Sequence, residues 1–173
     1  MSENIFLVGP MGVGKTTIGS HLARKLKYDF VDSDTEIEKR TGASISLIFD
    51  IEGEEGFRKR EAQMIEDLTQ RRHIVLSTGG GSVLDEISRQ NLRSKGYVVY
   101  LKASVDILYE RLKKSRNRPL METDEKQKVI EDLLVEREPL YLAVADITIA
   151  TDGRSAQEVA REIYSQHEKH LKP

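Results

Sequence analysis

The chain has 173 residues, a length typical of one domain that can bury a hydrophobic core. Its 27 lysines and arginines nearly balance 29 aspartates and glutamates, which argues against a partner such as nucleic acid or an anionic membrane surface. There is no cysteine, which excludes disulfides and thiolate metal sites and fits a reducing compartment. The apolar runs are too short to span a bilayer. The first expected strand begins almost at the N-terminus and leaves no room for a signal peptide, so we expect a soluble, cytoplasmic protein.

A glycine-rich loop stands between the first expected strand, at 5–8, and the first expected helix. The strand residues are all apolar, which suits burial on both faces, and apolar residues return at helical spacing after Lys15. Residues 9–16 between them read G-x-x-x-x-G-K-T. The N–H groups of such a loop and the start of the helix cradle phosphates, a surface Lys15 reaches them, and the Thr16 hydroxyl ligates Mg²⁺. The pattern predicts a nucleoside triphosphate site rather than a simple turn.

Two carboxylates follow the second expected strand, at 30–32. If the chain stays extended through Asp32 and Asp34, both side chains point to one side. Beside a triphosphate, one would join the Mg²⁺ shell and the other would contact a substrate hydroxyl. The alternative is that one caps a helix while the other is solvated. The third strand ends in Ser77 and Thr78, without the acidic residue that usually holds Mg²⁺ in such folds, so Asp32 is the candidate for the metal's water shell.

Helix and strand signals alternate along the rest of the chain. The expected helices lie at about 35–42, 44–53, 54–68, 85–96, 104–112, 129–139 and 155–163, and the expected strands at 74–76, 97–101 and 146–149. Pro139 should end or kink its helix, and Ser155 with Glu158 should form a capping box. Five strands separated by helices predict a three-layer α/β/α fold around a doubly wound, five-stranded parallel sheet. Ligands of such sheets bind beyond the carboxyl ends of the strands, where the candidate residues converge.

Two features could recognise a small molecule at that edge of the sheet. The glycine run 79–81 ends the third strand with unobstructed backbone N–H groups. We favour a binding role over a flexible turn, because three glycines cost conformational entropy that a turn alone does not require. Arg58 and Glu61 are either an ordinary surface ion pair or a guanidinium that its partner holds in place for a carboxylate substrate. Their spacing alone does not decide between these alternatives.

A basic stretch interrupts the α/β pattern at 111–118, where five of eight residues are basic and none is acidic. Such a run is usually a solvated face. A kinase, however, needs a mobile cover that brings positive charge to the transferring phosphoryl group. Arg118, with Pro119 behind it, is the candidate for that contact.

Taken together, these features resemble the shikimate kinases, of the bacterial single-domain type, over essentially the whole chain. The resemblance is carried by six segments in order, at 9–16 (GPMGVGKT), 32–34 (DSD), 52–58 (EGEEGFR), 78–81 (TGGG), 118–120 (RPL) and 136–141 (EREPLY). It implies ATP-dependent phosphorylation of the shikimate 3-hydroxyl within aromatic amino acid biosynthesis. It also implies a P-loop NTPase domain over 1–173 with strand order 2-3-1-4-5. In that domain, a helical region at about 33–61 would bind the substrate, and a lid would lie at about 113–124.

The resemblance assigns roles to individual residues as well. The ATP phosphates would be bound by Gly12, Val13, Gly14, Lys15, Thr16 and Thr17, with Arg111 and Arg154 near the adenine. Asp34 would contact the shikimate hydroxyls as the base, and Lys15 and Arg118 would complete the catalytic set. The carboxylate would be held by Arg58 and Arg137, and the ring would lie against Gly79, Gly80 and Gly81. One Mg²⁺ per subunit would be bound by Thr16 and, through water, by Asp32.

Two other functions remain open at this stage. A P-loop kinase of another polyol acid or of a nucleotide would share the fold, but a nucleotide acceptor needs groups for a second base and phosphate. Two arginines and two carboxylates suit a small hydroxy acid instead. A non-catalytic, nucleotide-binding relative should have lost Lys15, Asp34 or Arg118, and all three are present. No large apolar interface is evident in the sequence, so we expect a monomer, with no nucleic acid or membrane partner.

Overall fold

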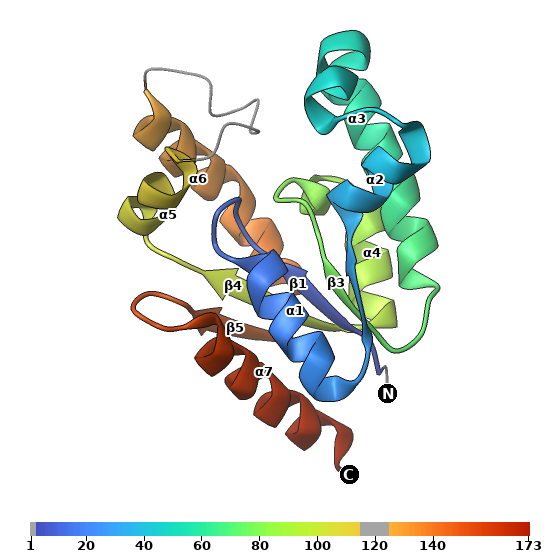
Figure 1. Cartoon of the computed structure of the whole chain (residues 1–173), viewed down its shortest axis with the longest axis vertical. Helices are drawn as coiled ribbons and strands as arrows, with labels where there is room; N and C mark the ends of the chain where they lie inside the picture. Colours follow the sequence, from blue (N-terminus) through green and yellow to red (C-terminus); the bar gives the residue numbers. More distant parts are fainter. Residues whose placement is uncertain (1–2, 115–124) are drawn as a thin grey trace.

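The computed structural model describes residues 3–114 and 125–173. Its centre is a five-stranded sheet in the order β2-β3-β1-β4-β5, in which every neighbouring pair is parallel (Figure 1). The strands are β1 (Ile5–Val8), β2 (Asp29–Asp32), β3 (Ile74–Ser77), β4 (Tyr97–Lys102) and β5 (Ile147–Ala150). The predicted strand order and the predicted parallel sheet are confirmed. Because β1 lies between β3 and β4, its residues are fully buried, as its apolar sequence predicts.

Helices cover both faces of this sheet. They are α1 (Lys15–Leu26), α2 (Ser33–Thr41), α3 (Ile45–Thr69), α4 (Glu86–Lys95), α5 (Val105–Leu112), α6 (Lys126–Val144) and α7 (Ala156–Leu171), with a short 3₁₀ turn, η1 (Ser82–Leu84). Ile5 and Leu7 of β1 join a core with α1, α5 and α7. Phe6 and Val8 point to the opposite face and join a second core with α2, α3, α4 and α6. The sheet is therefore packed against helices on both faces, which fixes the position of the residues at its carboxyl edge.

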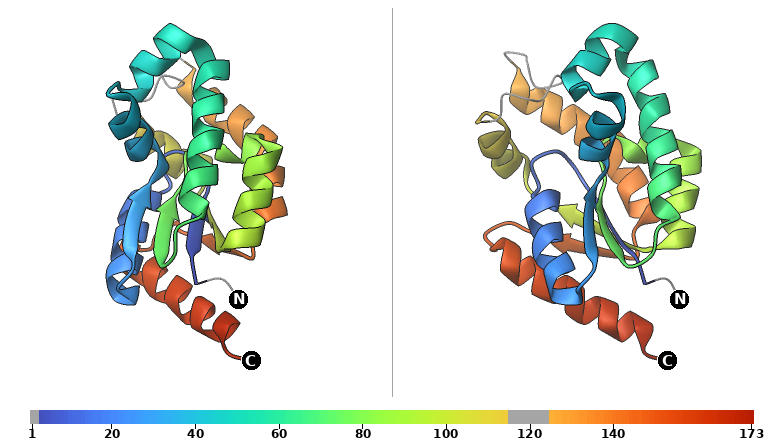
Figure 2. Two further views of the ribbon diagram at one scale, coloured as in Figure 1. Left: turned by 90° about the vertical axis from the view of Figure 1, so that its right-hand side faces the viewer. Right: turned by 45° about the vertical axis from the view of Figure 1, so that its right-hand side comes forward.

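Helix boundaries follow the capping residues that the sequence shows. Asp85, Ser104 and Ser155 each accept a hydrogen bond from the backbone N–H three residues further on. Gly53, with a φ of 73°, interrupts α3, so the helices predicted at 44–53 and 54–68 are the two halves of this element. The first half of α3, together with α2, extends beyond the carboxyl ends of the strands (Figure 2). These helices therefore form a wall above the edge where ligands are expected.

Pro139 does not end its helix, because α6 continues to Val144. Pro139 itself is exposed, whereas Tyr141 and Val144 in the next turn are buried in the second core. Burial of that turn holds the helix together across the missing N–H group, so of the two predicted effects of Pro139, a helix end or a kink, the helix end is wrong. None of the helices in the described residues is long and apolar enough to cross a membrane.

Candidate active site

The phosphate loop, residues 9–14, links β1 to the N-terminus of α1 at the carboxyl edge of the sheet. It needs glycine where the chain packs tightly: a Cβ on Gly9 would lie 2.5 Å from the Leu101 carbonyl oxygen, and one on Gly12 would lie 3.0 Å from Leu112. A cavity of about 190 Å³, the phosphate cavity, opens in front of the loop and the first turn of α1. The partial positive charge of the helix N-terminus and the loop N–H groups suit this cavity to phosphate oxygens.

Lys15 is not a surface residue, contrary to the prediction. Its side chain is buried, and its ammonium nitrogen donates hydrogen bonds to the carbonyl oxygens of Gly9 at 2.6 Å and Pro10 at 2.8 Å. Both acceptors belong to the start of the phosphate loop, and the lysine follows directly after its end. The loop therefore folds back so that its first residues contact the lysine side chain. The ammonium group therefore lies under the loop in this structure, and it also lines the phosphate cavity.

Thr16 and Asp32 meet at the floor of the phosphate cavity. The Thr16 hydroxyl donates to Asp32 Oδ2 at 3.1 Å, while Asp32 Oδ1 accepts the backbone N–H of Thr35 at 3.1 Å. Asp32 is thus a helix cap, one of the alternatives that the sequence presented, and it also lies beside the hydroxyl of Thr16. The cap starts α2 at Ser33, so the predicted extended geometry through Asp34 is wrong. Asp34 lies in the first turn of α2 instead and still lines the phosphate cavity.

A second cavity of about 500 Å³, the acceptor cavity, adjoins the first. The lining residues that the two cavities share are Met11, Thr16, Asp32, Asp34, Gly79 and Gly80. Beyond this boundary the acceptor cavity is lined by α2, α3, the glycine run and α6, with Arg58, Glu61 and Arg137 as its buried or half-buried charges. A molecule in the acceptor cavity and a phosphate in the other would therefore meet beside Asp34.

Arg58 and Glu61 form a buried ion pair rather than a surface one. Arg58 Nη1 lies 2.9 Å from Glu61 Oε1, and the Glu61 side chain is only 4% exposed. Glu54, one turn earlier on α3, contacts the other end of the same guanidinium at 3.3 Å. Burial raises the pKa of Glu61 above its usual value, and the Arg58 charge opposes this shift only in part. The geometry fits a carboxylate that holds the guanidinium in one orientation.

The glycine loop, residues 79–81, lies directly against the charged side chains of the acceptor cavity. A Cβ on Gly79 would lie 2.7 Å from Glu61 Oε2 and 3.0 Å from Asp34 Oδ1. A Cβ on Gly80 would lie 3.5 Å from Arg137 Nη1, and one on Gly81 would overlap the Arg58 guanidinium. A side chain at Gly79 or Gly81 would push the facing charged groups away, whereas a Cβ at Gly80 would make only ordinary van der Waals contact. Four charged side chains therefore converge on one stretch of backbone, and two of its three glycines are needed for that close approach.

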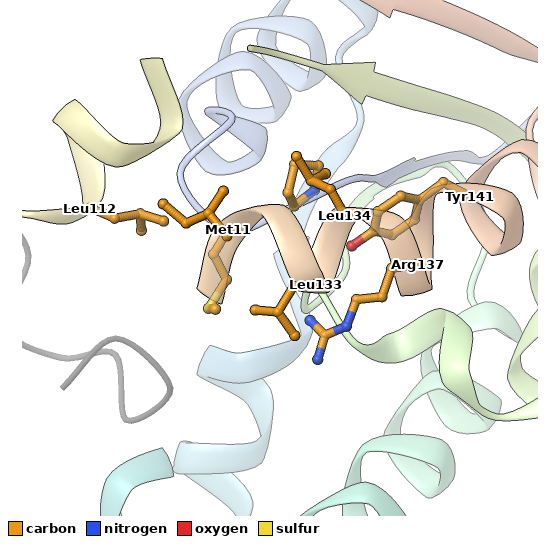
Figure 3. Close-up of a pocket in the computed structure, with 8 residues that line it drawn as sticks. Met11, Leu112, Leu133, Leu134, Arg137 and Tyr141 are labelled. Atoms are coloured by element: carbon orange, nitrogen blue, oxygen red, sulfur yellow. The ribbon is translucent and has the colours of Figure 1, made fainter. Parts of the chain in front are cut away.

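Arg137 comes from α6 on the far side of the glycine loop. Its side chain is buried, and its Nε has no hydrogen-bond partner among the residues that the structure describes. It also borders a small cavity of about 20 Å³, which Met11 and Tyr141 line as well (Figure 3). A buried guanidinium with unused donor capacity fits an anionic ligand.

The remaining predicted ATP contacts are less closely grouped. Arg111 donates to the carbonyl oxygens of Gly12 and Val13, at 3.1 and 3.0 Å, and so lies against the phosphate loop. Arg154 pairs with Glu162 at 2.6 Å, and it lines neither the phosphate cavity nor the acceptor cavity. Arg118 and most of the predicted lid, at 115–124, lie outside the described residues.

Some residues at the site were not predicted from the sequence. Met11 lines both cavities, and the Ser33 hydroxyl accepts the Gly79 N–H at 3.1 Å. Tyr141 donates from its hydroxyl to the Gly80 carbonyl oxygen at 2.5 Å. Its position four residues after Arg137, on the same helical face, was the available signal.

Comparison with known proteins identifies the family of this chain. A family model for shikimate kinase matches residues 11–168. The chain is 52% identical over 169 residues to a shikimate kinase of Vibrio cholerae, covering 98% of this chain and 97% of the relative. The chain belongs to the shikimate kinase family. A shikimate kinase of Vibrio parahaemolyticus is 55% identical over 167 residues, 96% of this chain and 97% of the relative.

A solved structure supports the same family. Shikimate kinase from Acinetobacter baumannii in complex with shikimate superposes with a TM-score of 0.96 at 44% identity, covering 99% of this chain and 97% of that one. The predicted family, the P-loop fold and the class of ATP-dependent small-molecule kinases are confirmed. The alternative of a non-catalytic relative therefore loses its support.

One stability prediction follows from the burial of Glu61. At low pH the carboxyl is protonated in the folded and the unfolded chain; as pH rises past 4.5, the unfolded chain loses this proton first. The free energy of unfolding should therefore fall until the pH passes the raised folded-state pKa. Glu61→Gln removes this dependence, so it should be as stable as the parent at pH 4 and at least as stable at pH 7. Urea titrations over this pH range measure the difference, with Glu54→Gln, the exposed partner of the same arginine, as the control. A Glu61→Gln protein whose stability relative to the parent falls as pH rises would contradict it.

Proposed function

We propose that this chain transfers the γ-phosphoryl group of ATP to the 3-hydroxyl of shikimate, with the triphosphate in the phosphate cavity and shikimate in the acceptor cavity. The observation that carries the proposal is that the two cavities adjoin at Asp34, while two arginines line the acceptor side. A small hydroxy acid needs this combination, with one anionic end to bind and one hydroxyl to activate. A coupled assay of ADP release, with and without shikimate, tests it. Release that does not depend on shikimate would contradict the proposal.

In this arrangement Asp34 is the base that accepts the proton of the attacking hydroxyl. The phosphate loop, including Gly14 and Thr17, holds the triphosphate, and Lys15 leaves the Gly9 and Pro10 carbonyls to neutralise its charge. Gly79, Gly80 and Gly81 provide the flat backbone against which the ring lies. Arg118 remains a prediction from the sequence for the charge of the transition state. Arg111 and Arg154 remain predictions for the adenine, of which Arg111 has the support of its place beside the phosphate loop.

The protein side of a Mg²⁺ site fits Thr16 and Asp32. When bound to ATP, the ion would neutralise charge that builds on the phosphate oxygens. Two oxygen atoms 3.1 Å apart line the phosphate cavity, and no cluster of three acidic or histidine side chains occurs among the described residues. Such a site takes its other ligands from phosphate and water, as Mg²⁺ commonly does.

Asp32→Ala should raise the Mg²⁺ concentration needed for half-maximal rate while the KM for shikimate stays within about twofold. Titration of Mg²⁺ at saturating ATP measures this, and an unchanged Mg²⁺ requirement would contradict it.

Arg58 and Arg137, which we call the carboxylate clamp, give a prediction on the affinity for shikimate. Arg58→Lys keeps the positive charge but loses the planar pair of donors, so a bidentate contact with a carboxylate is no longer possible. The KM for shikimate should rise by a factor of about 10 or more, with little change in the KM for ATP. Arg60→Lys is the matched control, because Arg60 lies on the same helix and pairs with Glu52 outside the acceptor cavity. Equal effects on both substrates would argue against the clamp.

The substrate-binding region, the lid, the oligomeric state and the cellular location are part of the same proposal. The region at 33–61 forms one wall of the acceptor cavity, which supports its assignment to substrate binding. The lid at 113–124, the monomeric state and the cytoplasmic location remain proposals that rest on the sequence.

A further inference from the structure

Two buried tyrosine hydroxyls lie beside the turn of α6 that carries Arg137, and one of them reaches the glycine loop. The Tyr141 hydroxyl donates to the Gly80 carbonyl oxygen at 2.5 Å, and the Tyr100 hydroxyl of β4 donates to Glu138 Oε2 at 2.7 Å. Glu138 is adjacent to Arg137 in the helix, and Tyr141 follows it by about one turn. The Tyr141 bond links this turn to the glycine loop, whereas the Tyr100 bond ends on a side chain that also contacts Lys102.

The two tyrosine rings form a rigid pair. Their centroids lie 5.0 Å apart in a stacked arrangement, and both side chains are almost completely buried. Burial raises the pKa of Tyr141 to about 12 and raises the pKa of Tyr100 as well, so both hydroxyls keep their protons at neutral pH and act as donors. A buried, stacked ring has little freedom to move its hydroxyl. The Gly80 carbonyl is thus held by a donor in a fixed position.

Fixing this carbonyl fixes more than one atom. The peptide group between Gly80 and Gly81 is planar, so the orientation of the Gly80 carbonyl sets the direction of the Gly81 N–H. On the other side of the loop, the Gly79 N–H donates to Ser33 Oγ at 3.1 Å. Glycine without such contacts would sample many backbone conformations. The loop is therefore held in one conformation from α2 on one side and from α6 on the other.

We propose that Tyr141 is a positioning residue of the acceptor site, whose hydrogen bond to Gly80 sets the place of the glycine loop relative to the Arg137 guanidinium. Both side chains come from α6 (Figure 3), and the Tyr141 hydroxyl interacts with the Arg137 guanidinium. The inference rests on the proposed function of Arg137 and Gly80. It adds that the sites on α6 and on the glycine loop act as one unit, joined through a residue that touches neither substrate.

The test compares two variants that each lose one buried hydroxyl. Tyr141→Phe keeps the stacked ring but removes the hydroxyl's bond to Gly80 and its interaction with Arg137, so the KM for shikimate should rise roughly five- to tenfold while the KM for ATP stays within about twofold. Tyr100→Phe removes the matched hydroxyl from the same ring pair. Glu138 keeps Lys102 as a partner at 3.4 Å, and the glycine loop is not touched, so the KM for shikimate should stay within about twofold of the parent.

Arg137→Ala separates this inference from the proposed function. If Tyr141 acts through Arg137, the Tyr141→Phe change should add less than about twofold to the KM in the Arg137→Ala background. A fully additive effect, an equal KM increase in the two tyrosine variants, or an unchanged KM in Tyr141→Phe while Arg137→Ala raises it, would overturn the positioning role. An unchanged KM in Arg137→Ala would instead overturn the carboxylate clamp itself, and the positioning role with it.

Discussion

Replacing Asp34 with asparagine is expected to lower kcat by a factor on the order of 10² or more, because the amide keeps the size of the side chain but cannot accept the hydroxyl proton. Asp34 lies on the boundary of both cavities, as Asp32 does, but its Oδ1 approaches Gly79, whereas both carboxylate oxygens of Asp32 bond to Thr16 and Thr35. Steady-state kinetics with both substrates varied measure the effect. A change confined to the KM for shikimate would make Asp34 a binding residue rather than the base.

A matched control for this variant is available on the same helix. Glu36 is two residues further along α2, lines neither cavity, and pairs with Lys39 and Arg71 at the surface. Glu36→Gln removes one negative charge from α2, as Asp34→Asn does. We expect its kcat to stay within about twofold of the parent, because surface pairs of this kind contribute little. A comparable loss in both variants would indicate a general charge effect instead of a proton transfer.

The sequence predicted the sheet because local signals and burial agree there. Apolar runs of strand length are bounded by capping residues such as Asp85 and Ser104, and helix and strand alternate without a long interruption. The phosphate loop was equally clear, because Gly9, Gly12 and Gly14 all have a positive φ, a backbone conformation that glycine adopts without strain. In both cases the information lies within a few residues of the feature that it determines.

The features that the sequence left open or predicted wrongly depend on distant parts of the chain. The Arg58–Glu61 pair was left open, and Glu61 is buried where the glycine loop, which follows it by about twenty residues, lies against its carboxylate. Pro139 stays inside α6 because Tyr141 and Val144 in the following turn pack against the second core. A helical pattern cannot report such contacts, since they are made between elements rather than within one.

Lys15 is the residue whose placement changes the argument most. A surface lysine could be replaced by alanine without loss of stability, but here the ammonium nitrogen satisfies two carbonyl groups of the phosphate loop and the side chain is buried. Removing it leaves these acceptors without their donor, which costs about 1–3 kcal/mol for a buried group. The lysine therefore stabilises the empty loop, in addition to the role that we propose for it with phosphate.

Lys15→Met tests both roles, because methionine keeps much of the buried stem and removes only the charge and the donors. Turnover should fall at least about 10²-fold, since a positive group at the developing charge of the phosphoryl transfer is lost. The free energy of unfolding without nucleotide should fall too, by about 1–3 kcal/mol, as measured in urea. Lys25→Ala is the control on the same helix, where the exposed lysine lies over the Tyr164 ring and outside the phosphate cavity. Turnover within about twofold of the parent in Lys15→Met would contradict the catalytic role. Unchanged stability with lost turnover would show instead that the carbonyl contacts contribute nothing to the fold.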